Sequence, residues 1–547
     1  ALADNATAIG NGADVATGAT GSTAIGNGAE VTAGTNAIAT GTSATATGNS
    51  SIATGNNADA VGANAIATGE DADALADNAT AIGNGADVAT GATGSTAIGN
   101  GAEVTAGTNA IATGTSATAT GNNAIATGND ADALADNATA IGEGAVVGNS
   151  ATGSTAIGDG AVVAEDAENA IATGTGARAN TSNAIASGTN AQATGNGAQA
   201  AGNGAQAAGT SAQASGNGAQ AAGNGSIATG NSARAGSTIT VDNNGVITGT
   251  VDPAIVDAIA AGTRAQATTS NAIASGTDAT ASGTQAIATG ASATASGAEA
   301  IAVGVGAQAT ETGAVAIGRN ARALANPATA IGTDATASGS NSSAFGFEST
   351  ASGDFSTSLG RQSTASGVSS TSLGENARAS GNRSTAIGAG AIATASNQMA
   401  FGTSDSFYTL PGLASGGGFV ERQRQSGETR FVTVDGSGNL GTSTSMPFDA
   451  ERIENGLTSL GEQIQTVGAL SAALGAIPNA IPNGSNGGCG AGTGVYGGSF
   501  AGAVGCVARI SNNIVVNAAG ALTNSPAKSD FGSNSNFMGR VGIFLDW

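Results

Sequence analysis

Isoleucines that follow an alanine recur along most of the chain every fourteen residues, as at Ile38, Ile52 and Ile66. Around each one, small apolar and polar residues alternate for four or five positions, and a glycine follows. Alternation with a period of two predicts a short strand, and the glycine predicts a turn. Between Gln192 and Ile227 the spacing halves to seven, so each fourteen-residue unit consists of two strands and two turns.

Stacked units place each strand in parallel register with its copy in the next unit, about 4.8 Å away. A helix would scatter the isoleucines around its circumference, and each repeated glycine would destabilise it by about 1 kcal/mol. Residues 1–49 recur unchanged as residues 74–122, which is typical of a repeat array. The pattern predicts a mainly β chain whose head, residues 1–403, is a parallel solenoid of roughly 26 coils.

Residues 237–264 interrupt the repeat. Residues 238–241 alternate, residues 242–245 can form a turn, and Pro253 precedes an alanine-rich segment, residues 254–261. We interpret the interruption as an inserted hairpin followed by a short helix.

The isoleucines predict an oligomer. Burying one of them contributes about 1.5–3 kcal/mol, which is less than the cost of ordering a fourteen-residue coil. We therefore expect them to form a ridge that faces partner chains along a shared axis, with thirteen- and sixteen-residue spacings, such as Ile25 to Ile38 and Ile9 to Ile25, arising from turns of different length. The predicted ridge comprises Ile38, Ile52, Ile66, Ile171, Ile185, Ile273, Ile287, Phe345, Leu359, Leu373, Ile387 and Phe401.

Residues 404–446 form a connector with a predicted strand at residues 431–434. Apolar residues in residues 447–477 then follow the alternating four- and three-residue spacing of a heptad seam. The seam comprises Ile453, Leu457, Leu460, Ile464 and Val467. It favours parallel helices around one axis, and a single amphipathic helix on a globular domain is the alternative.

Residues 484–547 contain four segments of about ten residues with alternating faces, as expected of transmembrane strands. A turn at residues 497–498 would pair the first two strands wherever residue numbers sum to 995, so that Val495 faces Phe500. The face predicted to contact lipid comprises Val495, Phe500, Val504, Val541, Ile543, Leu545 and Trp547. The opposite face is small enough for a helix to pass beneath it, and comprises Gly490, Gly492, Gly494, Ala501, Ala503, Gly505 and Arg540.

The same pairing places Cys489 opposite Cys506, within reach of a disulfide. The alternative is two free thiols that face lipid. An oxidising compartment would permit the bond.

Composition narrows the function. With 90 glycines and 3% aromatic residues, the 547-residue chain cannot fill several ordinary cores. A net charge of −23 disfavours nucleic acid as a partner. Because there is no histidine, histidine-based catalysis and histidine metal sites are excluded. We expect no enzyme activity, cofactor or metal site.

The fourteen-residue repeat with segments such as residues 154–158, the heptad helix and the four terminal strands together resemble the trimeric autotransporter adhesins. The resemblance implies a left-handed parallel β-roll head and a short trimeric coiled coil. It also implies a homotrimer whose C-terminal strands form a twelve-stranded barrel in the bacterial outer membrane around three helices. Implied partners are the outer-membrane assembly machinery, the lipid membrane, and host matrix, host cells or other bacteria. An ice-binding solenoid and a passive surface spacer are the alternatives.

Overall fold

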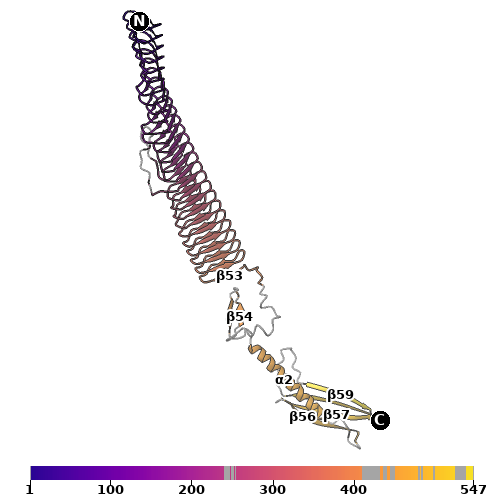
Figure 1. Cartoon of the computed structure of the whole chain (residues 1–547). Coiled ribbons are helices and arrows are strands. Elements are labelled where there is room, and N and C mark those ends of the chain that lie inside the picture. The colour runs from indigo at the N-terminus through magenta and orange to yellow at the C-terminus, as the bar shows by residue number, and fades with distance from the viewer. Residues whose placement is uncertain are drawn as a thin grey trace, which may run out of the picture. The chain divides into compact units, whose positions relative to one another are not determined.

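The computed structural model describes residues 2–239, 247, 252, 254–408, 431–434, 436, 440–443, 450–477, 481, 485–496, 499–523 and 537–545. The chain divides into two compact units, Ala1–Phe407 and Tyr408–Trp547. The first unit is the head and the second holds the C-terminal helix and strands (Figure 1).

Each coil of the head contributes one strand to each of two sheets. Sheet A holds 27 three-residue strands, from β1 (Thr7–Ile9) to β53 (Met399–Phe401). Sheet B holds the two-residue strands between them, from β2 (Asp14–Val15) to β52 (Ile392–Ala393). Each strand pairs in parallel with its equivalent in the next coil, as β1 pairs with β3 (Thr23–Ile25). The predicted parallel solenoid is confirmed.

Alanine fills the interior between the two sheets. In one coil, Ala53, Ala58, Ala60 and Ala65 have no exposed surface. The largest fully buried side chains of the head are valines at the position of Ala60: Val15, Val31, Val88, Val104, Val147 and Val163. Seven-residue half-coils hold the two sheets too close together for larger side chains, so the isoleucines lie outside the coil.

The predicted single ridge is wrong in one respect, because it combines two columns on the outer face of sheet A. The first and third residues of each sheet A strand both point outward, on either side of a buried alanine. Thr80 pairs with Ile66, and Ile82 pairs with Thr68, so the isoleucine changes column between these coils. Ile38, Ile52, Ile66, Ile171, Ile185, Ile273 and Ile287 are first residues of their strands, whereas Phe345, Leu359, Leu373, Ile387 and Phe401 are third residues.

Variation in coil length falls in the turn that leads from sheet B back to sheet A. Ile9 pairs with Ile25, which confirms that the sixteen-residue spacing reflects a longer turn. Ile38 pairs with Thr23, so the thirteen-residue spacing combines a fifteen-residue coil with a change of column. In the other turn, each sheet B strand starts seven residues after the sheet A strand before it.

A stacked glycine explains why that other turn does not vary. Gly55 follows β7 (Ile52–Thr54) with φ of 147°, and a Cβ atom there would overlap the carbonyl group of Gly69 in the next coil. The equivalent glycine recurs after every sheet A strand, so the turns stack without room for side chains at this position.

The insertion lies between β32 (Arg234–Ala235) and β33 (Ile259–Ala261). Ile239 is buried with Ala208 and Ala222, and Ile247 packs against this cluster. The predicted helix over residues 254–261 is wrong, because Ile259 pairs with Ile227 and Ile273 in sheet A. The predicted hairpin lies largely outside the described residues.

In the second unit, β54 (Phe431–Val434) pairs with β55 (Leu440–Ser443), which confirms the predicted strand and adds its partner. Helix α2 spans Ala450–Gly475. The strands β56 (Gly487–Tyr496), β57 (Ser499–Ser511), β58 (Ile514–Thr523) and β59 (Phe537–Leu545) form an antiparallel sheet in chain order. Val495 pairs with Phe500, as the predicted register requires. Within the described ranges, no helix is long and apolar enough to cross a membrane.

Candidate functional site

The outer face of sheet A carries most of the large aliphatic residues of the head. In the single chain Ile38 is 40% exposed and Leu359 is 47% exposed, although the alanines between the two columns are buried. Strand alternation produces this separation, because it sends the middle residue inward and its two neighbours outward. The face is an apolar stripe that a partner could cover.

The outer face of sheet B is polar and changes charge along the solenoid. Most of its early strands begin with acidic residues, and the chain contains no lysine or arginine before Arg178. Asp73 pairs in register with Asp59 and with Asp87, so three carboxyl groups stack in successive coils. Partial burial and, secondarily, the neighbouring carboxylates raise the pKa of each of them.

Later coils pair their charges along the axis. Arg264 contacts Asp278 at 2.6 Å, and Arg319 contacts Asp334 at 3.2 Å. In both pairs the partners lie on the turns of successive coils. Among the described residues, no three acidic or cysteine side chains are placed to hold a metal ion.

The heptad seam of α2 is exposed in the single chain. Its five residues, Ile453, Leu457, Leu460, Ile464 and Val467, are all more than half exposed. From Ala469 onward, α2 instead buries Leu470, Ala473 and Leu474 against the sheet. The first part of the helix therefore presents an apolar stripe, and its last turns are already covered.

The small-residue face of the C-terminal sheet lies against α2. Ala501 and Ala503 are buried with Ala473 in one cluster. A Cβ atom on Gly492 would come within 2.7 Å of the Ala473 carbonyl oxygen, and one on Gly494 would overlap the Ala473 backbone. On the same face Gly505 is packed against Ala519, while Gly490 is partly buried. Residues without side chains let the helix approach the strands closely.

The other face of this sheet is apolar and exposed. Its members Val495, Phe500, Val504, Val541 and Ile543 are all exposed, Val541 by 77%. Leu545 ends β59. Trp547 lies outside the described residues. This face differs sharply from the small face against α2.

Arg540 is the charged member of the small face. It lies on β59 opposite Ala519 of β58, and its guanidinium Nη2 donates to the carbonyl oxygen of Ile477 at 3.4 Å. Ile477 follows the last turn of α2, where carbonyl groups lack intrahelical partners and favour a cation. Arg540 is therefore placed to hold the end of the helix against the sheet.

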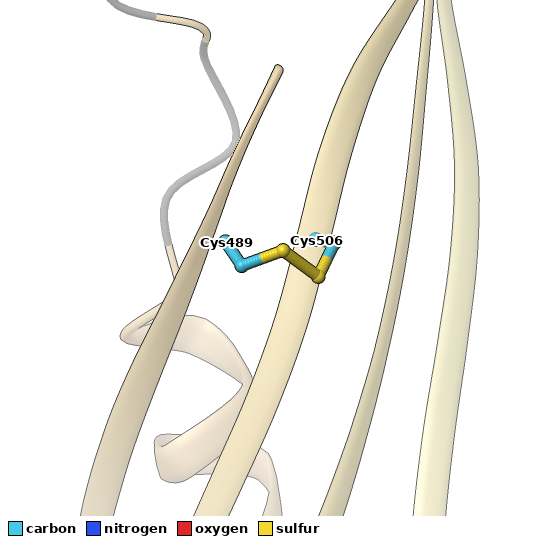
Figure 2. The surroundings of a disulfide bond; sticks show 2 residues. All are labelled: Cys489 and Cys506. Atoms are coloured by element: carbon cyan, nitrogen blue, oxygen red, sulfur yellow. A yellow bond between two sulfur atoms is a disulfide. The ribbon is translucent and has the colours of Figure 1, made fainter.

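A disulfide joins Cys489 of β56 to Cys506 of β57 (Figure 2). The two residues are directly opposite each other in the ladder, with their Cα atoms 4.0 Å apart. Both cysteines are exposed, so the bond ties the first hairpin on the face of the sheet opposite the one that α2 covers.

The stacked glycines and the alanine core were not singled out from the sequence, although the regular glycine spacing was their visible signal. The close approach of α2 to the small face of the sheet was predicted from the small residues on both, and the buried cluster of Ala473 with Ala501 and Ala503 confirms it. The head features become interpretable only when register shows which backbone atoms lie opposite each glycine.

Comparison with known protein families gives two matches. The YadA head domain repeat (two copies) matches eleven stretches between residues 33 and 391: residues 33–58, 60–86, 106–131, 119–145, 166–191, 256–279, 274–300, 295–321, 323–349, 337–363 and 365–391. The YadA-like membrane anchor domain matches residues 480–547. No curated protein matches the chain.

Proposed function

Since this chain is a trimeric autotransporter adhesin, with a β-solenoid head displayed at the cell surface and a C-terminal outer-membrane anchor, we propose how its faces assemble. Three copies turn the outer faces of sheet A toward a shared axis. Their α2 seams pair as a short parallel coiled coil. The four terminal strands of each copy close one twelve-stranded barrel, with the ends of the three helices in its lumen.

The observation that carries this proposal is the contrast between the two faces of the C-terminal sheet. The face toward α2 consists mainly of glycine and alanine, and the other is exposed and apolar. Lipid covers the apolar face because exposed apolar strands are costly in water. We assign Val495, Phe500, Val504, Val541 and Ile543 to lipid, and Gly490, Gly492, Gly494, Ala501, Ala503, Gly505 and Arg540 to the lumen.

The head serves attachment to host matrix, host cells or other bacteria, after the outer-membrane machinery has assembled the anchor. A repetitive surface offers many equivalent weak contacts, and simultaneous engagement multiplies their effect. The acidic early coils disfavour nucleic acid as the partner. We propose an adhesive function that depends on reach and repetition.

Paired substitutions test the assembly. Ile273→Glu with Ile287→Glu would bury charges between copies, whereas Thr280→Glu with Thr294→Glu places the same charges on sheet B of the same coils. We expect the first pair to abolish cross-linked head trimers on cells and the second to preserve them. Equal behaviour of the two pairs would contradict the proposed axis.

Attachment needs its own test. Cells that display the full chain should bind immobilised matrix or host cells, and cells that display the anchor without residues 1–403 should lose most of that binding. Surface staining of a tag beside the anchor controls for display. Unchanged attachment would indicate a passive spacer.

A further inference from the structure

The apolar stripe of sheet A is interrupted at two successive coils. The strands β27 (Gln199–Ala201) and β29 (Gln213–Ser215) carry glutamine in the first column and a small residue in the third. Gln199 pairs in register with Ile185 on one side, and Gln213 pairs with Ile227 on the other. Both glutamines are exposed in the single chain. The solenoid continues through them without a change of coil length.

The insertion is packed on the opposite face of these same coils. Ile239 is buried against Ala208 and Ala222, which directly follow the sheet B strands of these coils, and the Ile247 amide donates to Gln192 Oε1 on sheet B of the preceding coil at 2.8 Å. The two coils that lack an isoleucine on sheet A thus bury additional apolar side chains of the insertion beside sheet B. The glutamines therefore do not mark a place where the head has lost its order.

Because the apolar stripe repeats from coil to coil, it does not by itself determine how three heads align along the axis. If three identical heads slide by one coil, about 4.8 Å, most isoleucines meet isoleucines again. The changes of column elsewhere only move an aliphatic residue within the same face. The head is a compact unit by itself, and a register signal within it would act directly on its repeated coils.

We propose that Gln199 and Gln213 of the three copies form a polar layer on the shared axis and thereby fix the axial register of the heads. This inference rests on the proposed function, in which the sheet A faces meet at that axis. In register, the amides of the three copies can donate to and accept from one another. After a slip of one coil, Gln213 of one copy lies beside Ile227 of another, and Ile185 lies beside Gln199.

A slip therefore costs free energy at two levels, because amides surrounded by aliphatic side chains lose hydrogen-bond partners. The same principle applies where one buried polar residue sets the register of a coiled coil at some expense of stability. The glutamines would act as a specificity device in an otherwise repetitive interface.

The test compares two double variants in the full-length protein on cells. Gln199→Ile with Gln213→Ile removes the layer and restores the residue found in neighbouring coils. Gln206→Ile with Gln220→Ile makes the same chemical change on sheet B of these coils, where the two amides are bonded at 3.2 Å. Register is read by co-expressing two differently tagged chains, one with Ile273→Cys and one with Ile287→Cys, and by counting same-position and offset disulfides.

With native glutamines, same-position disulfides should predominate. The Gln199→Ile and Gln213→Ile variant should raise the offset fraction about tenfold, the ratio expected for losing one buried amide interaction. The sheet B variant should leave the ratio unchanged. An unchanged ratio in both variants would overturn the register role.

The same cross-linking experiment gives a different result if the proposed arrangement of the three heads is itself wrong. If sheet A does not face the axis, no disulfide forms at position 273 in any background, and a cysteine introduced by Thr280→Cys on sheet B cross-links instead. That outcome overturns the proposed function together with the inference, whereas an unchanged ratio overturns only the inference.

Discussion

The head and the C-terminal sheet both use small residues inside and large apolar residues outside, but for different reasons. In the head, alanines such as Ala53 and Ala60 are buried because two sheets of one coil lie close together. In the C-terminal unit, Gly492 and Gly494 are small because a helix crosses the sheet. The first region excludes side chains between sheets, and the second excludes them between a sheet and a helix.

The difference separates what folds each region from what each presents to others. An ordinary domain buries its large apolar side chains in its own core. Here Ile38 and Val541 are both exposed in the single chain. The small residues define the fold, and the large residues are available for copies of the chain or for lipid.

The largest effect is expected where the helix meets the sheet. In Gly494→Ala the new Cβ would overlap the backbone of Ala473, so α2 must move away from β56. We expect loss of assembled protein from the cell surface, with a cost on the order of 3 kcal/mol or more. Surface labelling and heat-resistant trimers in detergent measure it.

Gly502→Ala is the matched control on the neighbouring strand. A Cβ atom there has no neighbour within 4 Å, and substitution should be tolerated. If both variants assemble normally, close packing of α2 on the small face is not required.

A comparable substitution in the head should act only locally. Gly69→Ala would place its Cβ into the carbonyl of Gly83, at a backbone φ of 144°. We expect destabilisation of the adjacent coils by about 3 kcal/mol, seen as new protease cleavage near residue 69. The anchor should still assemble.

Gly85→Asn is the control, at a glycine two residues after the stacked glycine of the next coil. Gly85 has φ of 62° and open space around it, and Asn57 adopts φ of 57° at the equivalent position of another coil. The change should cost less than about 0.5 kcal/mol. Equal cleavage in both variants would show that the stacked glycines are not special.

Sequence reasoning recovered the repeat and the strand pairing because both depend on counting. A two-residue turn fixes antiparallel register, so Cys489 and Cys506 could be placed opposite each other before the structure. Counting failed for the aliphatic columns. Ile301 and Ile317 are sixteen residues apart, but Val315 is the residue that pairs with Ile301. A turn that is longer by two residues and a move of the isoleucine from the first to the third position of its strand both increase the spacing between isoleucines by two.

The false helix at residues 254–261 has a different cause. An alanine-rich segment directly after a proline suits the start of a helix, and no period distinguishes helix from strand over only eight residues. Pairing with Ile227 and Ile273 decides in favour of a strand at Ile259. The strand at Ile259 is determined by pairing with the neighbouring coils, which the local sequence alone does not reveal.

The disulfide should have an intermediate effect. A bond that closes a loop of this length stabilises a folded chain by about 3 kcal/mol through the unfolded state. Reductant should therefore lower the midpoint at which the native trimer dissociates on heating in detergent, and should not affect the variant with Cys489→Ser and Cys506→Ser. Alkylation of two thiols without reductant would show that the bond does not form in cells.

The smallest effect concerns the three aspartates that stack on sheet B in the early coils of the head, Asp59, Asp73 and Asp87. Because folding raises the pKa of Asp59, Asp73 and Asp87, the folded state binds protons more tightly than the unfolded state. Burial of these carboxyl groups, and secondarily repulsion from neighbouring carboxylates, therefore destabilises the coils most above the folded-state pKa values. This penalty disappears as pH falls toward about 4, the ordinary value for aspartate.

Asp73→Asn should remove part of the penalty at about pH 7, by on the order of 0.5 kcal/mol, and should change little at about pH 4. Asp278→Asn is the opposite control, because Arg264 lowers the pKa of Asp278 in a later coil. That variant should weaken its coils at neutral pH. Hydrogen exchange of the two sets of coils at both pH values measures the pair of effects. Asp73 lies among other carboxylates, whereas Asp278 lies beside the Arg264 guanidinium, so the two variants should change hydrogen-exchange protection in opposite directions at neutral pH. A change in the same direction would show that neighbouring charges do not determine the stability of these coils.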